Sequence, residues 1–178
     1  MNDLRAENAR KEDLNMFSLR EVFDLAIRIE KNGEQYYREA VEKVSNPSLR
    51  SMLEWLAEQE SKHQSWFSER KERLDTEGED LEVAEMGSSI LQGILGDQSF
   101  SLKEADLSAI DGVEALIQLA VEFEKDSILF YEMIGSFIED SETSEKLNEI
   151  IAEENRHIEL LEDFQDTEES SPKMREEE

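Results

Sequence analysis

The chain lacks cysteine altogether and has only two prolines and seven glycines among its 178 residues. Without cysteine, disulfides, zinc ribbons and Cys-ligated iron–sulfur sites are excluded. The prolines and glycines lie mainly between periodic segments, which favours long helices over short strands and turns. No apolar run approaches the roughly 20 residues of a membrane span, and residues 1–20 are charged throughout, unlike a secretory signal. We therefore expect a cytoplasmic protein without a membrane partner.

Basic residues are also scarce, with 19 Lys and Arg against 46 Asp and Glu and a formal net charge of −27. Phosphate contacts need patches of Lys and Arg, so nucleic acid and anionic membrane surfaces are poor partners. The acidity fits a soluble protein or one that attracts cations. We interpret most of the acidic residues as solvated helix faces.

Apolar residues recur at helical spacing in four long segments. The first is expected over residues 18–44, where Ser18 opens a capping box. After a short break, Asn46 can cap the second helix and Pro47 suits its first position, with an end near residue 74. Because the turn between them is short, these two helices should be antiparallel neighbours.

The second half repeats this arrangement. Asp111 opens another capping box, which predicts a helix to about Ile138. Ser141 is the expected cap of the fourth helix, which should end near Phe164. The sequence therefore predicts an all-α four-helix bundle of two helical hairpins.

Three further segments complete the expected organisation around a bundle domain at residues 18–165. Residues 1–17 are an N-terminal extension, and residues 75–110 are a long crossover connection with a short helix at residues 90–95. Residues 166–178 form an acidic tail that is expected to be disordered.

An internal repeat is the most informative feature of the chain. A shift of 94 residues aligns residues 25–63 with residues 119–157 without a gap. The matched pairs include Glu30 with Glu124, Tyr37 with Tyr131, Glu60 with Glu154 and His63 with His157. Both histidines of the protein follow a glutamate by three residues and the glutamate of the preceding helix by 33 residues. In a glutamate-rich chain, the repetition of this relation carries more weight than either histidine alone.

The repeated residues have the chemistry of a two-metal site. A Glu-x-x-His pair on a helix presents both side chains on one face, and two such pairs with one further Glu from each other helix make the ligand set of di-iron and di-manganese carboxylate bundles. The predicted ligands are Glu30, Glu60, His63, Glu124, Glu154 and His157, with Glu60 and Glu154 as bridges. Two divalent ions would balance four carboxylates; iron or manganese suits these donors, and zinc is compatible with them.

Each member of this set also has a simpler interpretation, as a solvated Glu or a structural His. Glu30 and Glu124 lie on core-facing stripes, however, where an unpaired carboxylate needs an explanation. Tyr37 and Tyr131 follow these glutamates by seven residues on the same helix face. Three roles are open for the two tyrosines: hydrogen-bond donors to ligand carboxylates, redox-active phenols, or core residues. Glu34 is a candidate extra ligand, but its repeat partner is an isoleucine.

At residues 26–31, 60–63, 120–125 and 154–157 the chain resembles the rubrerythrin-like branch of the ferritin-like superfamily. The resemblance covers all four helices. It implies a ferritin-like fold, a non-haem di-iron centre that reacts with hydrogen peroxide or dioxygen, a role in oxidative stress, and a homodimer. The apolar segment at residues 90–95 is a candidate dimer contact, and the long connector is compatible with exchange of helices between protomers.

Two features differ from rubrerythrins. The chain lacks the Cys-ligated iron of a rubredoxin domain, so its electron donor must be external, such as a rubredoxin-like protein. Ser127 stands where rubrerythrins carry a second glutamate in the third helix. Three functions therefore remain open: a peroxide- or oxygen-reducing oxidoreductase, a ferroxidase that handles iron without a peroxidase cycle, and a non-catalytic helical metal-binding module.

Overall fold

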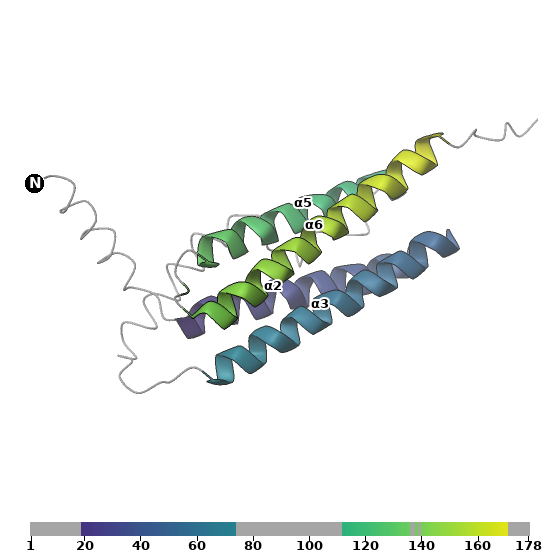
Figure 1. The fold of residues 1–178 in the computed structure, drawn as a ribbon. Helices are drawn as coiled ribbons and strands as arrows, with labels where there is room; N and C mark the ends of the chain where they lie inside the picture. Colours follow the sequence, from purple (N-terminus) through teal and green to yellow (C-terminus); the bar gives the residue numbers. More distant parts are fainter. Residues whose placement is uncertain (1–18, 74–111, 136–137, 139, 171–178) are drawn as a thin grey trace, which may run out of the picture.

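The computed structural model describes residues 19–73, 112–135, 138 and 140–170. Within them the chain forms four helices, α2 (Leu19–Val41), α3 (Pro47–Arg73), α5 (Val113–Gly135) and α6 (Ser141–Ser170). The helices α2 and α3 form one hairpin, α5 and α6 form the other, and the two hairpins lie side by side (Figure 1). This arrangement confirms the predicted all-α bundle. The expected crossover at residues 75–110, with its short helix, lies outside the described residues.

The turn of the first hairpin is stabilised as the sequence predicts. Asn46 Oδ1 accepts hydrogen bonds from the backbone N–H groups of Ser48 at 2.9 Å and Leu49 at 3.2 Å, which caps the start of α3. The Arg50 guanidinium donates to the Val41 carbonyl at 2.6 Å and so joins the first turn of α3 to the last residue of α2.

The cap of α6 is Asp140, so the prediction of Ser141 is wrong by one residue. The Asp140 carboxylate accepts from the Thr143 backbone N–H at 2.8 Å and also from the Thr143 hydroxyl. Ser141 is already the first helical residue. Arg70 of α3 donates to the same carboxylate, which links the start of α6 to the neighbouring hairpin.

The helix ends differ from the sequence expectation by a few residues. The helix α6 continues to Ser170 rather than ending near Phe164, so residues 166–170 of the expected tail are helical. The helices α2 and α5 end earlier than predicted, at Val41 and Gly135. The expected N-terminal extension and residues 171–178 lie outside the described part of the chain, and the domain boundaries there stay a prediction.

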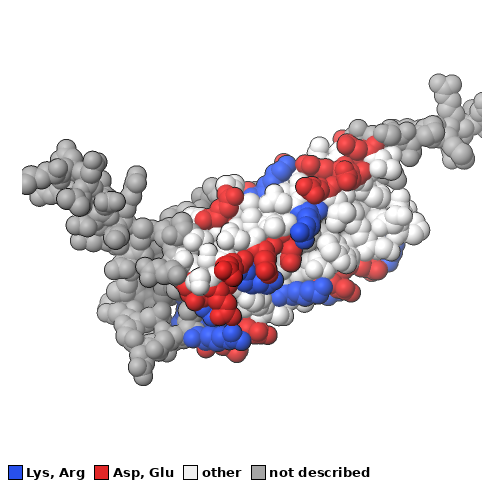
Figure 2. All heavy atoms as spheres, in the orientation of Figure 1, with Lys and Arg blue, Asp and Glu red and all other residues white. Residues whose placement is uncertain are grey.

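The inward faces of all four helices form one apolar core. Its largest fully buried side chains include Phe23, Phe67, Phe123, Leu53 and Leu147, and each such side chain contributes about 1.5–3 kcal/mol on burial. Acidic and basic side chains are interspersed on the outer face seen in Figure 2. None of the described helices carries an apolar stretch that could cross a bilayer.

Candidate metal centre

A polar layer interrupts the apolar core at mid-height in the bundle. Its six side chains are between 0% and 3% exposed: Glu30 from α2, Glu60 and His63 from α3, Glu124 from α5, and Glu154 and His157 from α6. These are the six residues that the sequence predicts as ligands, and the structure brings all of them together. The Glu-x-x-His spacing places each pair on the inner face of its helix.

The six residues fall into two overlapping groups. One, here called the His63 half, consists of Glu30, Glu60, His63 and Glu154; the other, the His157 half, consists of Glu60, Glu124, Glu154 and His157. In each group the candidate ligand atoms lie within 4.8 Å of one another. Ligands at opposite sides of a metal ion are about 4–4.4 Å apart, so each group has the dimensions of one ion site. Glu60 and Glu154 belong to both groups, as bridging carboxylates must.

Every one of these six residues has at least one buried ligand atom that makes no well-formed hydrogen bond, although several of these atoms face one another as imidazole–carboxylate pairs. The atoms are Glu30 Oε2, Glu60 Oε1, His63 Nδ1, Glu124 Oε2, both carboxylate oxygens of Glu154, and Nδ1 and Nε2 of His157. Buried polar atoms are normally paired, and unpaired carboxylates in a core are strongly destabilising. A pair of divalent cations would satisfy these atoms, so the residues present fit a two-metal centre.

The two imidazole rings lie on either side of Glu154. Their centroids are 6.1 Å apart with an angle of 21° between the ring planes. His63 Nδ1 is 2.9 Å from Glu154 Oε1, and His157 Nδ1 is 2.7 Å from Glu154 Oε2. Burial alone would raise the pKa of Glu154, but its close contacts with His157 and His63, and the charges of these rings, lower it to about 2. At the rings the carboxylates outweigh burial: contacts with Glu154 and Glu30 raise the pKa of His63 to about 11, and contacts with Glu124 and Glu154 raise the pKa of His157 to about 9.

The other three carboxylates have the opposite tendency. Burial, with repulsion from Glu154, raises the pKa of Glu60 well above its usual value and that of Glu124 to about 7. Burial also raises the pKa of Glu30. Protons therefore offset the negative charge of the polar layer, and a metal ion that binds here must displace them.

Each candidate terminal glutamate accepts a hydrogen bond from a tyrosine of the other hairpin. The Tyr37 hydroxyl of α2 donates to Glu124 Oε1 of α5, and the Tyr131 hydroxyl of α5 donates to Glu30 Oε1 of α2. Burial and the nearby carboxylates raise the pKa of both phenols well above the usual value, which keeps them protonated. Among the open interpretations, this geometry favours donors that orient ligand carboxylates.

The family model described as Rubrerythrin matches residues 21–165, which is more than half of the chain. The chain belongs to the rubrerythrin family. Among solved structures it is similar to a ferritin-like diiron-carboxylate protein of Thermotoga maritima, with a TM-score of 0.58 and 22% identity over 80% of this chain and 90% of that chain. At this identity the likeness supports the ferritin-like fold alone. No match was found among curated protein sequences.

Ser127 is where this rubrerythrin-family chain departs from the expected pattern. Its side chain is buried, and its hydroxyl donates to the Phe123 carbonyl of its own helix at 3.0 Å. The repeat partner of Ser127 is Gly33 in α2. A Cβ at Gly33 would lie only 2.7 Å from both Glu60 Oε2 and Phe123 Cε1, so the glycine makes room for a candidate bridging carboxylate.

Glu34, the candidate extra ligand, is directed elsewhere. It accepts a hydrogen bond from Arg38 Nε at 2.8 Å and belongs to neither group of the centre. Sequence reasoning missed Glu153, whose carboxylate lies 2.6 Å from His63 Nε2. The repeat contained no signal for it, because the matching position in the first half is Gln59.

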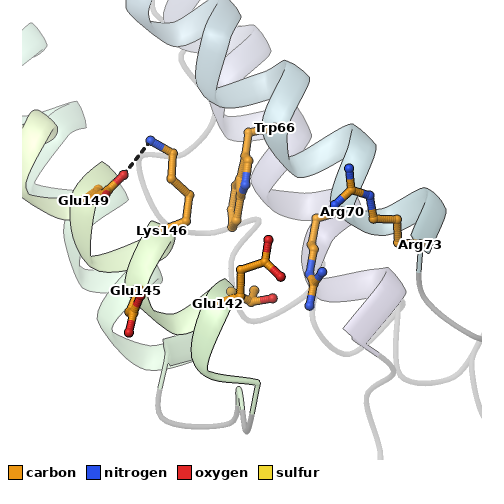
Figure 3. A pocket seen from close by; sticks show the side chains of 8 residues that line it. Trp66, Arg70, Arg73, Glu142, Glu145, Lys146 and Glu149 are labelled. Atoms are coloured by element: carbon orange, nitrogen blue, oxygen red, sulfur yellow. Dashed lines mark hydrogen bonds and ion pairs between the residues drawn. The ribbon is translucent and has the colours of Figure 1, made fainter.

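A surface pocket of about 280 Å³ lies between the C-terminal part of α3 and the N-terminal part of α6 (Figure 3). It is lined by Trp66, Arg70, Arg73, Glu142, Thr143, Glu145, Lys146 and Glu149. None of these is a candidate ligand. The mixed charges of the lining, including the Lys146–Glu149 ion pair at 2.9 Å, do not select a ligand of one charge.

Proposed function

We propose that the protein is a non-haem di-iron carboxylate oxidoreductase of the rubrerythrin and ferritin-like type. It would reduce hydrogen peroxide or dioxygen with electrons from iron or from an external donor. The observation that carries this proposal is the pair of buried groups that share Glu60 and Glu154, with ligand atoms on all six members that make no well-formed hydrogen bond.

Iron is the proposed metal for chemical reasons. The donor set combines four carboxylates with two imidazoles, which suits iron or manganese and is compatible with zinc. Family membership and the diiron-carboxylate description of the Thermotoga maritima relative favour iron. Two ferrous ions would supply one electron each, so that one peroxide takes up two electrons and two protons to give two water molecules.

The protein's own residues have separate roles in this proposal. Glu60 and Glu154 would hold both ions, while Glu30 and Glu124 would each hold one. The tyrosine hydroxyls fix the two terminal carboxylates in place, and the apolar side chains above and below the polar layer exclude bulk water. The proposed reductant lies outside these 178 residues, which contain no cysteine, and a rubredoxin-like protein is the proposed class. The homodimer, the role in oxidative stress and the cytoplasmic location belong to the same proposal.

A second candidate function is iron oxidation without a peroxidase cycle. Ser127 favours it, since the serine hydroxyl is bonded to the backbone of its own helix and offers no carboxylate to the centre. The ferroxidase reaction needs neither a further glutamate nor a rubredoxin domain.

Anaerobic loading with ferrous iron, followed by separate challenges with peroxide and dioxygen, tests these functions. The oxidoreductase should bind two iron ions per chain, oxidise them faster with peroxide than with dioxygen, and cycle when a reduced rubredoxin is supplied. Oxidation of many more iron ions, with mineral accumulation, supports the iron-handling protein. The double variant Glu60→Gln/Glu154→Gln should lose iron, and the exposed pair Glu58→Gln/Glu159→Gln is its control. A purified protein that takes up no iron contradicts both functions and leaves a non-catalytic helical module.

A further inference from the structure

The two histidines differ in what their outward-facing nitrogens contact. His63 Nε2 lies 2.6 Å from Glu153 Oε2, a hydrogen-bond distance between imidazole and carboxylate. The Glu153 side chain is 35% exposed, so this contact joins the buried ring to the surface of α6. On the opposite edge of the ring, His63 Nδ1 faces Glu154 in the candidate metal centre. The His63 ring is therefore held between a carboxylate outside and the ligand set inside.

The outward-facing nitrogen of His157 has no such contact. Its ring is fully buried, and among the described residues Nε2 has no hydrogen-bond partner. The Trp55 ring packs edge-to-face against the His157 ring, with the ring centroids 5.4 Å apart and an angle of 85° between the ring planes. Trp55 is itself 41% exposed, so an aromatic side chain rather than a carboxylate separates this histidine from solvent.

The residue at the repeat position of Glu153 is Gln59, and its amide is engaged elsewhere. When the Gln59 side-chain amide is oriented so that its oxygen faces hydrogen-bond donors, this oxygen accepts from Lys62 Nζ at 3.1 Å and from Trp55 Nε1 at 3.2 Å. It therefore stabilises the position of Trp55. Both histidines match in the repeat, but only His63 has a carboxylate beside its outward-facing nitrogen.

This difference has a predictable effect on metal binding. A histidine ligand usually donates its second ring N–H to a carboxylate or carbonyl, which fixes the tautomer and orients the other nitrogen toward the metal. At His63 the Glu153 carboxylate can accept the Nε2 proton, which leaves the Nδ1 lone pair directed at the other ligands. The carboxylate also adds a negative charge close to one half of the centre.

We propose that Glu153 is a positioning residue for His63 that strengthens metal binding in the His63 half. Gln59, at the matching position, leaves the His157 half without this support. The inference rests on the metal binding in the proposed function, but not on the redox reaction.

The test measures binding of Co²⁺ alone, followed by its visible absorption, in variants that keep one half of the centre. Glu124→Gln removes a ligand of the His157 half only, and Glu30→Gln removes a ligand of the His63 half only. In the Glu124→Gln background, Glu153→Ala should weaken Co²⁺ binding by about 10- to 100-fold. Glu153→Gln, which keeps an acceptor oxygen, should restore part of that affinity. In the Glu30→Gln background, Glu153→Ala should leave the affinity within about twofold of the parent.

A reciprocal variant keeps the test independent of how well the Glu153 variants fold. Gln59→Glu gives His157 the partner that His63 already has, and in the Glu30→Gln background it should tighten Co²⁺ binding by roughly tenfold. Glu159→Ala, which removes an exposed carboxylate from the same helix, controls for net charge and should change neither half.

A spectroscopic readout separates positioning from a general loss of stability. In the Co²⁺-loaded Glu124→Gln protein, the shifted ring N–H proton of His63 should exchange slowly with water, and Glu153→Ala should broaden it by fast exchange. An equal loss of Co²⁺ affinity in both backgrounds, or no loss in the Glu124→Gln background, overturns the proposal. Failure of the unmutated chain to bind Co²⁺ overturns the metal centre as well. Tight Co²⁺ binding without iron oxidation contradicts only the proposed function.

Discussion

The two hairpins contribute the same kinds of ligand to the centre but surround them differently. Each supplies two glutamates and one histidine, related by the 94-residue repeat. Yet Glu154 contacts both imidazoles and has its pKa lowered to about 2, while burial and carboxylate neighbours raise the pKa of its repeat partner Glu60. The repeat thus determines which residues can be ligands, whereas the residues around them determine how charge is distributed over the two halves.

The surroundings differ at two more repeat positions. Gly33 leaves space for the Glu60 carboxylate and the Phe123 ring, while its partner Ser127 carries a hydroxyl bonded to its own helix. Glu153 contacts His63, while its partner Gln59 contacts Trp55. The four predictions below use these matched positions to test how far the two halves are equivalent.

The largest effect is expected at a shared carboxylate. Glu154→Gln should abolish tight binding of both metal ions, because Glu154 belongs to both groups, whereas Glu30→Gln and Glu124→Gln should each lose one ion. At a thousand times its Kd, each bound ion stabilises the fold by about 4 kcal/mol, so metal should no longer raise the Tm of the Glu154 variant. Metal content and thermal unfolding with and without Co²⁺ provide the measurement, with Glu159→Gln as the control. If the Glu154 variant still binds two ions tightly, the carboxylate is not shared.

The second prediction concerns pH. The pKa of His63 is raised to about 11 and that of His157 to about 9, so both rings are protonated in the metal-free protein below pH 8 and must lose a proton to bind metal. Metal affinity should therefore rise with pH in both halves, by about tenfold per pH unit for each proton displaced. Titrations of the Glu30→Gln and Glu124→Gln variants with Co²⁺ at pH 6, 7 and 8 measure the two slopes. If the Co²⁺ affinity of one half does not change with pH, the histidine of that half does not lose a proton on metal binding, and the two histidines are not equivalent.

The third prediction compares Gly33 with Ser127. Gly33→Ala places a methyl group 2.7 Å from Glu60 Oε2 and from the Phe123 ring, and overpacking of this kind costs about 1–3 kcal/mol. Ser127→Ala removes a hydroxyl whose partner is a carbonyl of the same helix, so its cost should be below about 1 kcal/mol. Chemical denaturation of the metal-free proteins measures both. Equal costs would mean that the bundle relaxes around the added methyl group.

The smallest effect should come from the tyrosine hydroxyls. Tyr37→Phe and Tyr131→Phe each remove one hydrogen bond to a buried carboxylate, at an expected cost of about 1 kcal/mol. Because the two contacts are related by the repeat, the free energies of unfolding of the two variants should be closely similar. A large difference between them would place one phenol in a role beyond orienting its glutamate.

The sequence was sufficient to predict the fold and to select six residues that the structure groups together, because both depend on spacing. Helical period predicts which face of each helix is buried, and the repeat relates the ligands of α2 and α3 to those of α5 and α6. The position of Asn46 as a cap was predicted for the same reason, since capping is local.

The features that could not be predicted from the sequence depend on contacts between helices. Glu153 is one of many acidic residues on α6, and only the packing of α3 against α6 brings its carboxylate to His63. The space that Gly33 leaves for Glu60 likewise depends on how closely α2 approaches α3 and α5. The cap of α6 was wrong by one residue because Asp140 and Ser141 are both good capping residues, and the sequence alone does not show which of the two reaches the Thr143 N–H.

The sharing of carboxylates between the hairpins also governs when the centre can exist. The His63 half takes three members from the first hairpin, but its fourth, Glu154, comes from α6. During synthesis the first hairpin emerges long before α6, so its acidic residues meet metal ions only as an incomplete site. If the centre binds metal as proposed, capture would follow docking of the second hairpin, and a complete ligand set would form only together with the core that encloses it.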